Sequence, residues 1–334
     1  MKFSRRTLLY SAGGLLCGAA SVTPTLAFAD DTAEYFYDAL GRLIRVELSD
    51  GTVVAYYYDA AGNRMTVTHG DDVAFNQTIQ VTGTSPVNLR TLANQSGYLG
   101  STNATITFQV GSTVTITGLA GGPNGGVAID TGVWPSATKS ISLTLQVSGK
   151  VYGGGGVGAS SGQAADNPGV GGDAIYCREN INVTVNAGGQ VRGGGGGGGH
   201  GGGWENAFLN GEGQWETVYK YGGGGGGGFP NGPGGTSESS SAGSSGTSSG
   251  GGAGGAGAGG GGHPAGAGGT GGGFAGTGNT GGAATGTPGC NLSGTICWNG
   301  PDAPGTGGAP GYAIRKNGKT VNVTNNGTIS GTVG

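Results

Sequence analysis

Runs of glycine constrain this chain more than any other feature of its sequence. Between residues 193 and 310, 51 of 118 residues are glycine, and the stretches Gly193–Gly199 and Gly222–Gly228 are uninterrupted. The same segment holds only twelve large apolar side chains, too few to build a hydrophobic core. The glycines come in runs and not at every third position, which excludes collagen. Cohesion must therefore come from the backbone, or the segment is a flexible linker.

An extended threefold helix offers a way for the backbone to supply that cohesion. Glycine can adopt the polyproline II conformation, which rises about 3.1 Å per residue. Such polyglycine II rods lack side chains, so they can approach closely and bond amide to carbonyl laterally. Ordering each residue costs about 1–2 kcal/mol of backbone entropy, so a bundle needs several rods and an ordered frame. Serine-rich residues 237–250 and alanine-diluted residues 251–286 interrupt the glycine pattern and weaken this expectation there.

A unit that occurs three times can supply the frame. It consists of G-x-A-I, an alternating strand, a glycine turn and a short second strand ending in glycine, and it spans 126–153, 172–193 and 311–331. In the second copy, alternation places Ile181 and Val183 on one face and Asn182 on the other. Three units could stack like the rungs of a solenoid around a narrow apolar seam. We therefore expect a mainly β fold with little or no α-helix after residue 29.

Residues 1–29 have the layout of a cleavable export signal. A basic start with Lys2, Arg5 and Arg6 precedes a short, weakly apolar stretch, and an A-x-A site ends at Ala29. The sequence around the two arginines resembles the twin-arginine (Tat) motif, while an ordinary secretory signal remains the alternative. The apolar stretch is shorter than a membrane span. We expect a periplasmic, cell-surface or extracellular protein of a bacterium.

Two tyrosine-aspartate motifs follow the signal. The segments Tyr35–Leu43 (YFYDALGRL) and Tyr56–Met65 (YYYDAAGNRM) place their Tyr-Asp pairs 21 residues apart. Asp38 and Asp59 can turn the chain by accepting backbone amides, and the glycine three residues later can adopt positive φ. Asp50-Gly51 adds a hairpin signal between them. We expect strand, turn, strand, turn and strand within residues 30–70.

These motifs resemble the YD repeat of Rhs and teneurin proteins. In those families, long arrays of the repeat spiral into a hollow β-shell. Two copies cannot enclose a cargo, so the resemblance implies a small docking module. We call residues 30–70 the YD module and expect it to contact another surface or fibre protein.

Residues 76–334 are similar to receptor-binding adhesins and tail-fibre tip domains of tailed phages. The similarity is carried by the segment Val87–Ala93, by Val191-Arg192-Gly193 at the entry into polyglycine, and by the closing segment Asn322–Gly331. It implies a β-rich frame over 76–192, packed polyglycine II rods over 193–310 and a closing β unit over 311–334. Loops at the rod ends would contact the host receptor. The signal and the YD module have no counterpart in such a fibre protein.

The candidate binding surface lies between the two seven-glycine runs, in residues 200–221. A row of aromatic rings there has no core to enter, and exposed tryptophan and tyrosine are typical of contact surfaces. The alternative is that the rings pack on one another to close the loop. The candidate ligand-binding residues are Trp204, Phe208, Trp215, Tyr219 and Tyr221. The expected ligand is a cell-surface receptor or a carbohydrate.

Cysteine and histidine positions give no catalytic or metal site. Cys290 and Cys297 could close a short disulfide loop that fixes Trp298 beside the glycine segment, which leaves Cys177 as an unpaired buried group. The three histidines are widely separated, and no nucleophile and base form a recognisable motif. The net charge of −3 and a pI near 5.6 argue against nucleic acid as a partner. We expect a non-enzymatic recognition protein without a cofactor; the alternative is a structural glycine-rich envelope protein with a disordered linker.

Overall fold

The mainly β fold that the sequence predicts is confirmed. The computed structural model describes residues 33–48, 52–59, 61–70, 74–98, 100–120, 125–162, 166–259, 262–290, 294 and 296–334. The export signal and the Asp50-Gly51 turn lie outside these residues. Within them the one helix, α1 (Leu89–Gln95), has seven residues. It is too short to cross a membrane, and no other described segment is a candidate membrane-spanning helix. The chain divides into two compact units, the first formed by residues 1–76, 93–105 and 135–141 and the second by the rest.

The YD module is an antiparallel meander in the first unit. Its described strands are β1 (Ala33–Tyr37), β2 (Leu43–Leu48), β3 (Val53–Tyr58) and β4 (Arg64–Gly70), paired in that order. The structure has one strand more than the sequence analysis expects, because the segment between the two Tyr-Asp motifs folds back on itself as β2 and β3.

Each Tyr-Asp motif closes a tight turn through its aspartate. The Asp38 carboxylate accepts the amides of Leu40 and Arg42 at 3.0 and 2.9 Å, and it accepts the Arg42 Nε at 2.6 Å. Asp59 accepts the Asn63 amide at 2.7 Å and the Asn63 side chain at 2.9 Å. The glycine three residues after each aspartate has φ of 77° or 88°, as predicted.

A β-solenoid whose described strands form four coils makes up most of the second unit apart from the glycine-rich segment. Successive coils stack so that Ile129, Ile175 and Ile314 lie in parallel register, and Val183 lies in register with Leu145 and Val323. The strands of the coils are, in order, β6 (Val87–Asn88), β7 (Ala104–Val110) and β8 (Thr115–Thr117); β9 (Ile129–Asp130), β10 (Ile141–Val147) and β11 (Lys150–Tyr152); β12 (Ile175–Tyr176), β13 (Ile181–Val185) and β14 (Gln190–Arg192); β19 (Ile314–Arg315), β20 (Val321–Asn325) and β21 (Thr328–Ser330). β5 (Phe75–Val81) completes a five-stranded sheet in the order β20-β13-β10-β7-β5.

Three of these coils are the repeated units of the sequence, and the first coil is an addition. In the first coil Val87 occupies the register position that Ile129 takes in the second, without the G-x-A-I pattern. Its third strand keeps the pattern of the other copies, with Ile116 opposite Val151. The seam is apolar as predicted, since Ile116, Leu145 and Val183 are fully buried.

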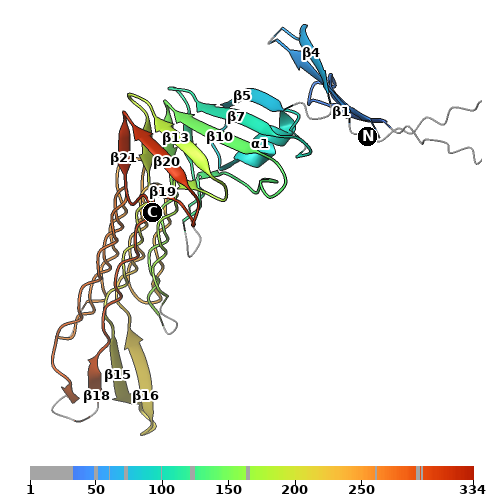
Figure 1. Ribbon diagram of the computed structural model, residues 1–334. Helices are drawn as coiled ribbons and strands as arrows, with labels where there is room; N and C mark the ends of the chain where they lie inside the picture. Colours follow the sequence, from blue (N-terminus) through green and yellow to red (C-terminus); the bar gives the residue numbers. More distant parts are fainter. Residues whose placement is uncertain are drawn as a thin grey trace, which may run out of the picture. The chain divides into compact units, whose positions relative to one another are not determined.

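A bundle of extended glycine-rich rods runs from the solenoid (Figure 1). The rods alternate in direction, because each segment that leaves the solenoid is followed by one that returns. We call the following segments the glycine rods: 153–162, 166–172, 193–203, 222–229, 232–240, 241–246, 251–258, 265–272, 276–283 and 302–311. They contain almost no strand or helix, and backbone amides and carbonyls of neighbouring rods bond to one another.

Lateral hydrogen bonds between the rods repeat every three residues. Along rod 193–203, backbone amides three residues apart donate to the carbonyls of one neighbouring rod. The amides one residue further along donate to a different rod. The pairs are Gly195–Phe229, Gly198–Gly226 and Gly201–Gly223 for one neighbour, and Gly196–Gly276, Gly199–Asn279 and Gly202–Gly282 for another, at 2.6–3.0 Å. Rods 193–203 and 222–229 each bond to six other rods in this way.

This arrangement explains why the two central rods are built from glycine. A Cβ added to Gly198 or Gly225 would lie under 3.0 Å from a backbone oxygen of a neighbouring rod. Outer rods admit side chains at every third position, where Ala253, Ala256 and Thr270 point to solvent. Ala253, Ala256 and Ala267 therefore fit the pattern, contrary to the expectation that the alanines of this segment interrupt it. The hydrogen-bonded bundle also gives no support to a flexible linker.

Candidate functional site

A four-stranded sheet lies at the end of the glycine rods away from the solenoid (Figure 1). It contains β15 (Trp204–Leu209), β16 (Trp215–Lys220), β17 (Gly289–Cys290) and β18 (Ile296–Pro301), in the order β16-β15-β18-β17. We call it the distal sheet. β15 directly follows rod 193–203, and β16 leads into rod 222–229. The two central rods are thus joined by a β-hairpin, where the sequence analysis expects a loop rich in aromatic residues.

A polar turn closes that hairpin. The Asn210 side-chain oxygen accepts the amides of Glu212 and Gln214 at 3.0 and 2.9 Å, and Gly213 adopts a positive φ of 76°. An Asx-type turn followed by a glycine in the left-handed region is a favourable link between antiparallel strands. The tip is exposed to solvent from Gly211 to Gln214.

The strand register divides the five candidate aromatic residues between two faces. Trp204 pairs with Lys220 and Phe208 with Glu216, so these side chains share one face. Trp215 and Tyr219 lie on the opposite face, since successive strand residues alternate. Tyr221 follows β16, and its ring stacks on Tyr219 with centroids 5.7 Å apart. The structure does not bring all five rings together.

Trp204 is the centre of a buried cluster beneath the distal sheet. Its side chain is fully buried, and its indole nitrogen donates to the Thr285 carbonyl at 3.2 Å. The His263 ring lies 4.9 Å from Trp204 and stacks on Trp298 at 4.4 Å. The Lys220 ammonium is 4.5 Å from the Trp298 ring centroid. Trp204 therefore packs against other rings instead of forming part of an exposed surface, as the alternative in the sequence analysis describes.

His263 is the member of this cluster that the sequence analysis did not identify. It lies in a glycine-rich turn 59 residues after Trp204, and no local pattern connects the two positions. The two residues meet because rod 251–258 carries the chain back out to the distal end of the bundle before rod 265–272 returns to the solenoid. Trp298, by contrast, follows Cys297, whose sulfur is bonded to that of Cys290 between β17 and β18.

The other face of the hairpin presents aromatic surface to solvent. Trp215 is 54% exposed and lies opposite Leu209, which is 37% exposed. Tyr219 and Tyr221 continue the row and are half-buried. Burial and the nearby Glu238 carboxylate raise the pKa of Tyr221, so its hydroxyl stays protonated and neutral. We call Leu209, Trp215, Tyr219 and Tyr221 the aromatic stripe.

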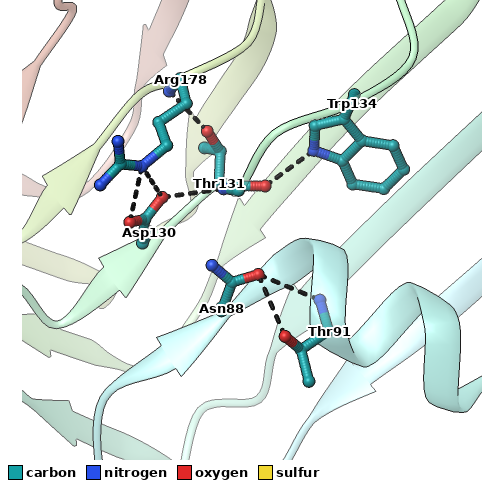
Figure 2. Close-up of polar contacts among 7 residues, drawn as sticks. Asn88, Thr91, Asp130, Thr131, Trp134 and Arg178 are labelled. Carbon is teal, nitrogen blue, oxygen red and sulfur yellow. Dashed lines mark hydrogen bonds and ion pairs between the residues drawn. The ribbon is translucent and has the colours of Figure 1, made fainter.

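A polar cluster on the solenoid, shown in Figure 2, is internally satisfied. Arg178 bonds both Asp130 carboxylate oxygens at 3.0 and 2.9 Å, and its amide donates to the Thr131 hydroxyl at 2.7 Å. The Trp134 indole donates to the Thr131 carbonyl at 2.7 Å. The bonds of Arg178 join the third coil to the second, so the cluster has a structural role in the solenoid. No group of three His, Cys, Asp or Glu side chains in the described part of the chain could hold a metal ion.

Comparisons with known proteins identify the families to which parts of this chain are similar. The family model described as phage tail fibre adhesin Gp38 matches residues 75–334, and the RHS repeat model matches residues 37–74. A solved structure, the crystal structure of the gp37-gp38 adhesin tip complex of the bacteriophage S16 long tail fiber, shares 25% identity with this chain. The match covers 77% of this chain and 82% of that one, with a TM-score of 0.43. No curated protein sequence matches the chain. Because the Gp38 model covers more than half of its residues, the chain belongs to the phage tail fibre adhesin Gp38 family, with an RHS repeat preceding the adhesin region.

Proposed function

We propose that this chain is an exported recognition protein that binds a receptor or glycan on a cell surface through the aromatic stripe of its distal sheet. The observation that carries the proposal is the exposure of Trp215 at the end of the two central rods, on the face opposite the buried cluster. Exposed tryptophan and tyrosine provide large contact areas at low entropic cost, and they dominate binding energy in protein interfaces.

The glycine rods would hold the stripe away from the solenoid. We propose that they are polyglycine II helices, because a period of three in the lateral hydrogen bonds is what a threefold helix produces. Rod 193–203 has eleven residues and would be about 34 Å long at about 3.1 Å per residue. A bundle of such rods is a stiff support, so the stripe would meet its target without a large ordering cost.

Substitution of Trp215 and Trp204 tests the binding surface. We expect Trp215→Ala to weaken binding of the labelled chain to its target cell or arrayed glycan by about 30-fold, the effect of an interface hot spot, without changing Tm. Trp204→Ala should cost about 3–5 kcal/mol of folding stability, because it leaves a cavity under the distal sheet. Val133→Ala, at a 74% exposed solenoid position, is the matched control. Full binding by a folded Trp215→Ala variant would remove the stripe from the site.

Export and docking complete the proposal. The signal at residues 1–29 would deliver the chain out of the cytoplasm, and replacing Arg5 and Arg6 with lysine should block a Tat route while keeping the charge. Unchanged export of that variant would indicate the general secretory route. The YD module would connect the adhesin to another surface or fibre protein. Tyr35 and Tyr37 on its edge strand β1 are 42% and 52% exposed, which leaves aromatic surface for such a contact.

A further inference from the structure

The outer face of the five-stranded solenoid sheet carries no charge. Strands β5, β7, β10, β13 and β20 contain no Asp, Glu, Lys, Arg or His. The inward residues of these strands are apolar except for Gln77 in β5 and Asn325 at the end of β20, and the outward residues are all amides or hydroxyls. Within the second unit the outward residues are Thr78, Gln80, Thr107, Gln109, Ser142, Thr144, Gln146, Asn182, Thr184, Asn322 and Thr324. A solvent-facing sheet without charged side chains is unusual, since charged residues normally occupy such positions.

Three glutamines on this face form a ladder beside a shallow hollow. The Gln80 side-chain amide donates to Gln109 at 2.6 Å, and the Gln109 amide donates to Gln146 at 3.0 Å. The hollow has a volume of about 290 Å³, and its lining is completed by Val110, Gly111, Ser112 and Ser148. We call it the glutamine hollow.

The ladder leaves hydrogen-bonding capacity at the hollow. A carboxamide can donate two hydrogen bonds and accept two. Gln109 uses one donor and one acceptor position in the ladder, and Gln146 uses one acceptor position. The remaining N–H and C=O groups stand about 4.8 Å apart from one strand to the next, which is the spacing of neighbouring strands in a sheet.

This chemistry selects an uncharged ligand that has many hydroxyl groups. A hydroxyl both donates and accepts, so adjacent hydroxyls can pair with the two ends of one carboxamide. A charged ligand would lose water in the hollow without meeting an opposite charge. A protein partner would need an aromatic or aliphatic anchor in a pocket, and the only apolar side chain lining the hollow, Val110, is 1% exposed.

We propose that the glutamine hollow binds a neutral oligosaccharide. The site is separate from the distal sheet and does not depend on the aromatic stripe. Its lining contains no ring on which a sugar could stack, so the affinity is low, with a Kd on the order of 1 mM. Several such contacts along one polysaccharide would act together with the distal sheet, since linked weak sites raise overall affinity.

Titration of the full-length ¹⁵N-labelled chain tests the site through its glutamine side-chain amide signals. The probes are maltohexaose, isomaltohexaose, cellohexaose and mannohexaose, with hexagalacturonate as the anionic comparison. We expect at least one neutral hexasaccharide to shift the signals of the ladder saturably, and hexagalacturonate to bind more weakly.

Variants distinguish this site from the distal sheet. Gln109→Ala and Gln146→Ala should each weaken the interaction by roughly fivefold, the effect of losing one or two hydrogen bonds. Gln214→Ala, at the exposed hairpin tip, and Trp215→Ala should leave it unchanged. Absence of saturable shifts with all four neutral probes would overturn the proposal. So would undiminished shifts in folded Gln109→Ala and Gln146→Ala variants, or equal binding of hexagalacturonate.

Discussion

A single methyl group in a central rod should destabilise the whole bundle, and Gly225→Ala is the sharpest test. Gly225 donates its amide to the Ala159 carbonyl at 2.8 Å and accepts the Gly235 amide at 2.8 Å. A Cβ at this position would lie under 3.0 Å from the Gly198 carbonyl oxygen, whereas ordinary contacts are 3.4–4 Å. Relief of that clash requires a neighbouring rod to move, because the opposing atom is backbone.

The magnitude follows from the hydrogen bonds that such a movement breaks. A shift of about 1 Å lengthens a 2.8 Å bond beyond the usual limit near 3.2 Å. Movement of rod 193–203 puts two lateral bonds of Gly198 at risk: its amide donates to the Gly226 carbonyl at 2.7 Å, and its carbonyl accepts the Ala159 amide at 2.9 Å. Each costs about 1.5–2 kcal/mol when the separated groups stay buried. Alanine offsets about 0.4–1 kcal/mol of this loss, because it restricts the unfolded chain more than glycine does. We expect a net loss of about 2–3 kcal/mol, which lowers Tm by about 5–10 °C in a unit of this size.

Differential scanning calorimetry of the full-length chain measures the effect. The matched control is Gly273→Ala at an exposed turn, where an added Cβ has no atom within 4 Å and φ is not positive. That substitution should leave Tm unchanged or raise it slightly, since its main effect is to lower the conformational entropy of the unfolded chain. If Gly225→Ala melts at the same temperature as Gly273→Ala, the close packing of the central rods is refuted.

Two further predictions concern the cysteines and the YD module. Mass spectrometry of exported, non-reduced chain should find Cys290 joined to Cys297, and iodoacetamide should leave native Cys177 unmodified because burial raises its pKa to about 12; pairing of Cys177 with either partner would contradict both expectations. Hydrogen bonds from Arg42 and Leu40 outweigh burial and lower the pKa of Asp38, and bonds from Asn63 lower that of Asp59. The stability that these carboxylates contribute is complete above their unfolded pKa, near 3.9, and is lost as pH falls through the lower folded values. Hydrogen exchange over residues 33–70, corrected for intrinsic rates, should therefore show protection at pH 5–7 that declines below about pH 4, and protection that persists at pH 2 would contradict this reasoning.

The β architecture could be predicted where the sequence repeats a local pattern. G-x-A-I and the alternation of Ile181, Asn182 and Val183 identify a stacked unit, because each feature has a geometric cause within a few residues. The repeated pattern does not reveal the first coil, because Val87-Asn88 occupies the same register without the G-x-A-I signature. The outer rods are harder to identify from the sequence. A glycine pair followed by Ala253 or Thr270 is recognisable as part of a rod only once the threefold period is known.

The candidate site was harder to predict because its contacts are distant in sequence. Local composition identified the aromatic segment, but burial of Trp204 and exposure of Trp215 depend on strand register and on the positions of His263 and Trp298. These two reach Trp204 only after several rods have run to the solenoid and back. The glutamine ladder likewise joins β5 to strands of the first two coils, and no single strand indicates it.

The atoms that stabilise the rod bundle differ from those of the proposed binding surface. The glycine rods are joined by backbone amides and carbonyls, so their cohesion requires the absence of side chains in the centre and is indifferent to which side chains stand at outer third positions. The hairpin between the central rods is anchored at its base by buried Trp204, whereas residues 211–215 at and beside its tip are exposed. Substitutions at that tip therefore change the surface offered to a ligand without breaking a bond of the bundle. A rod bundle of this kind can carry many different binding surfaces at nearly constant stability, which is the property that a receptor-binding protein requires.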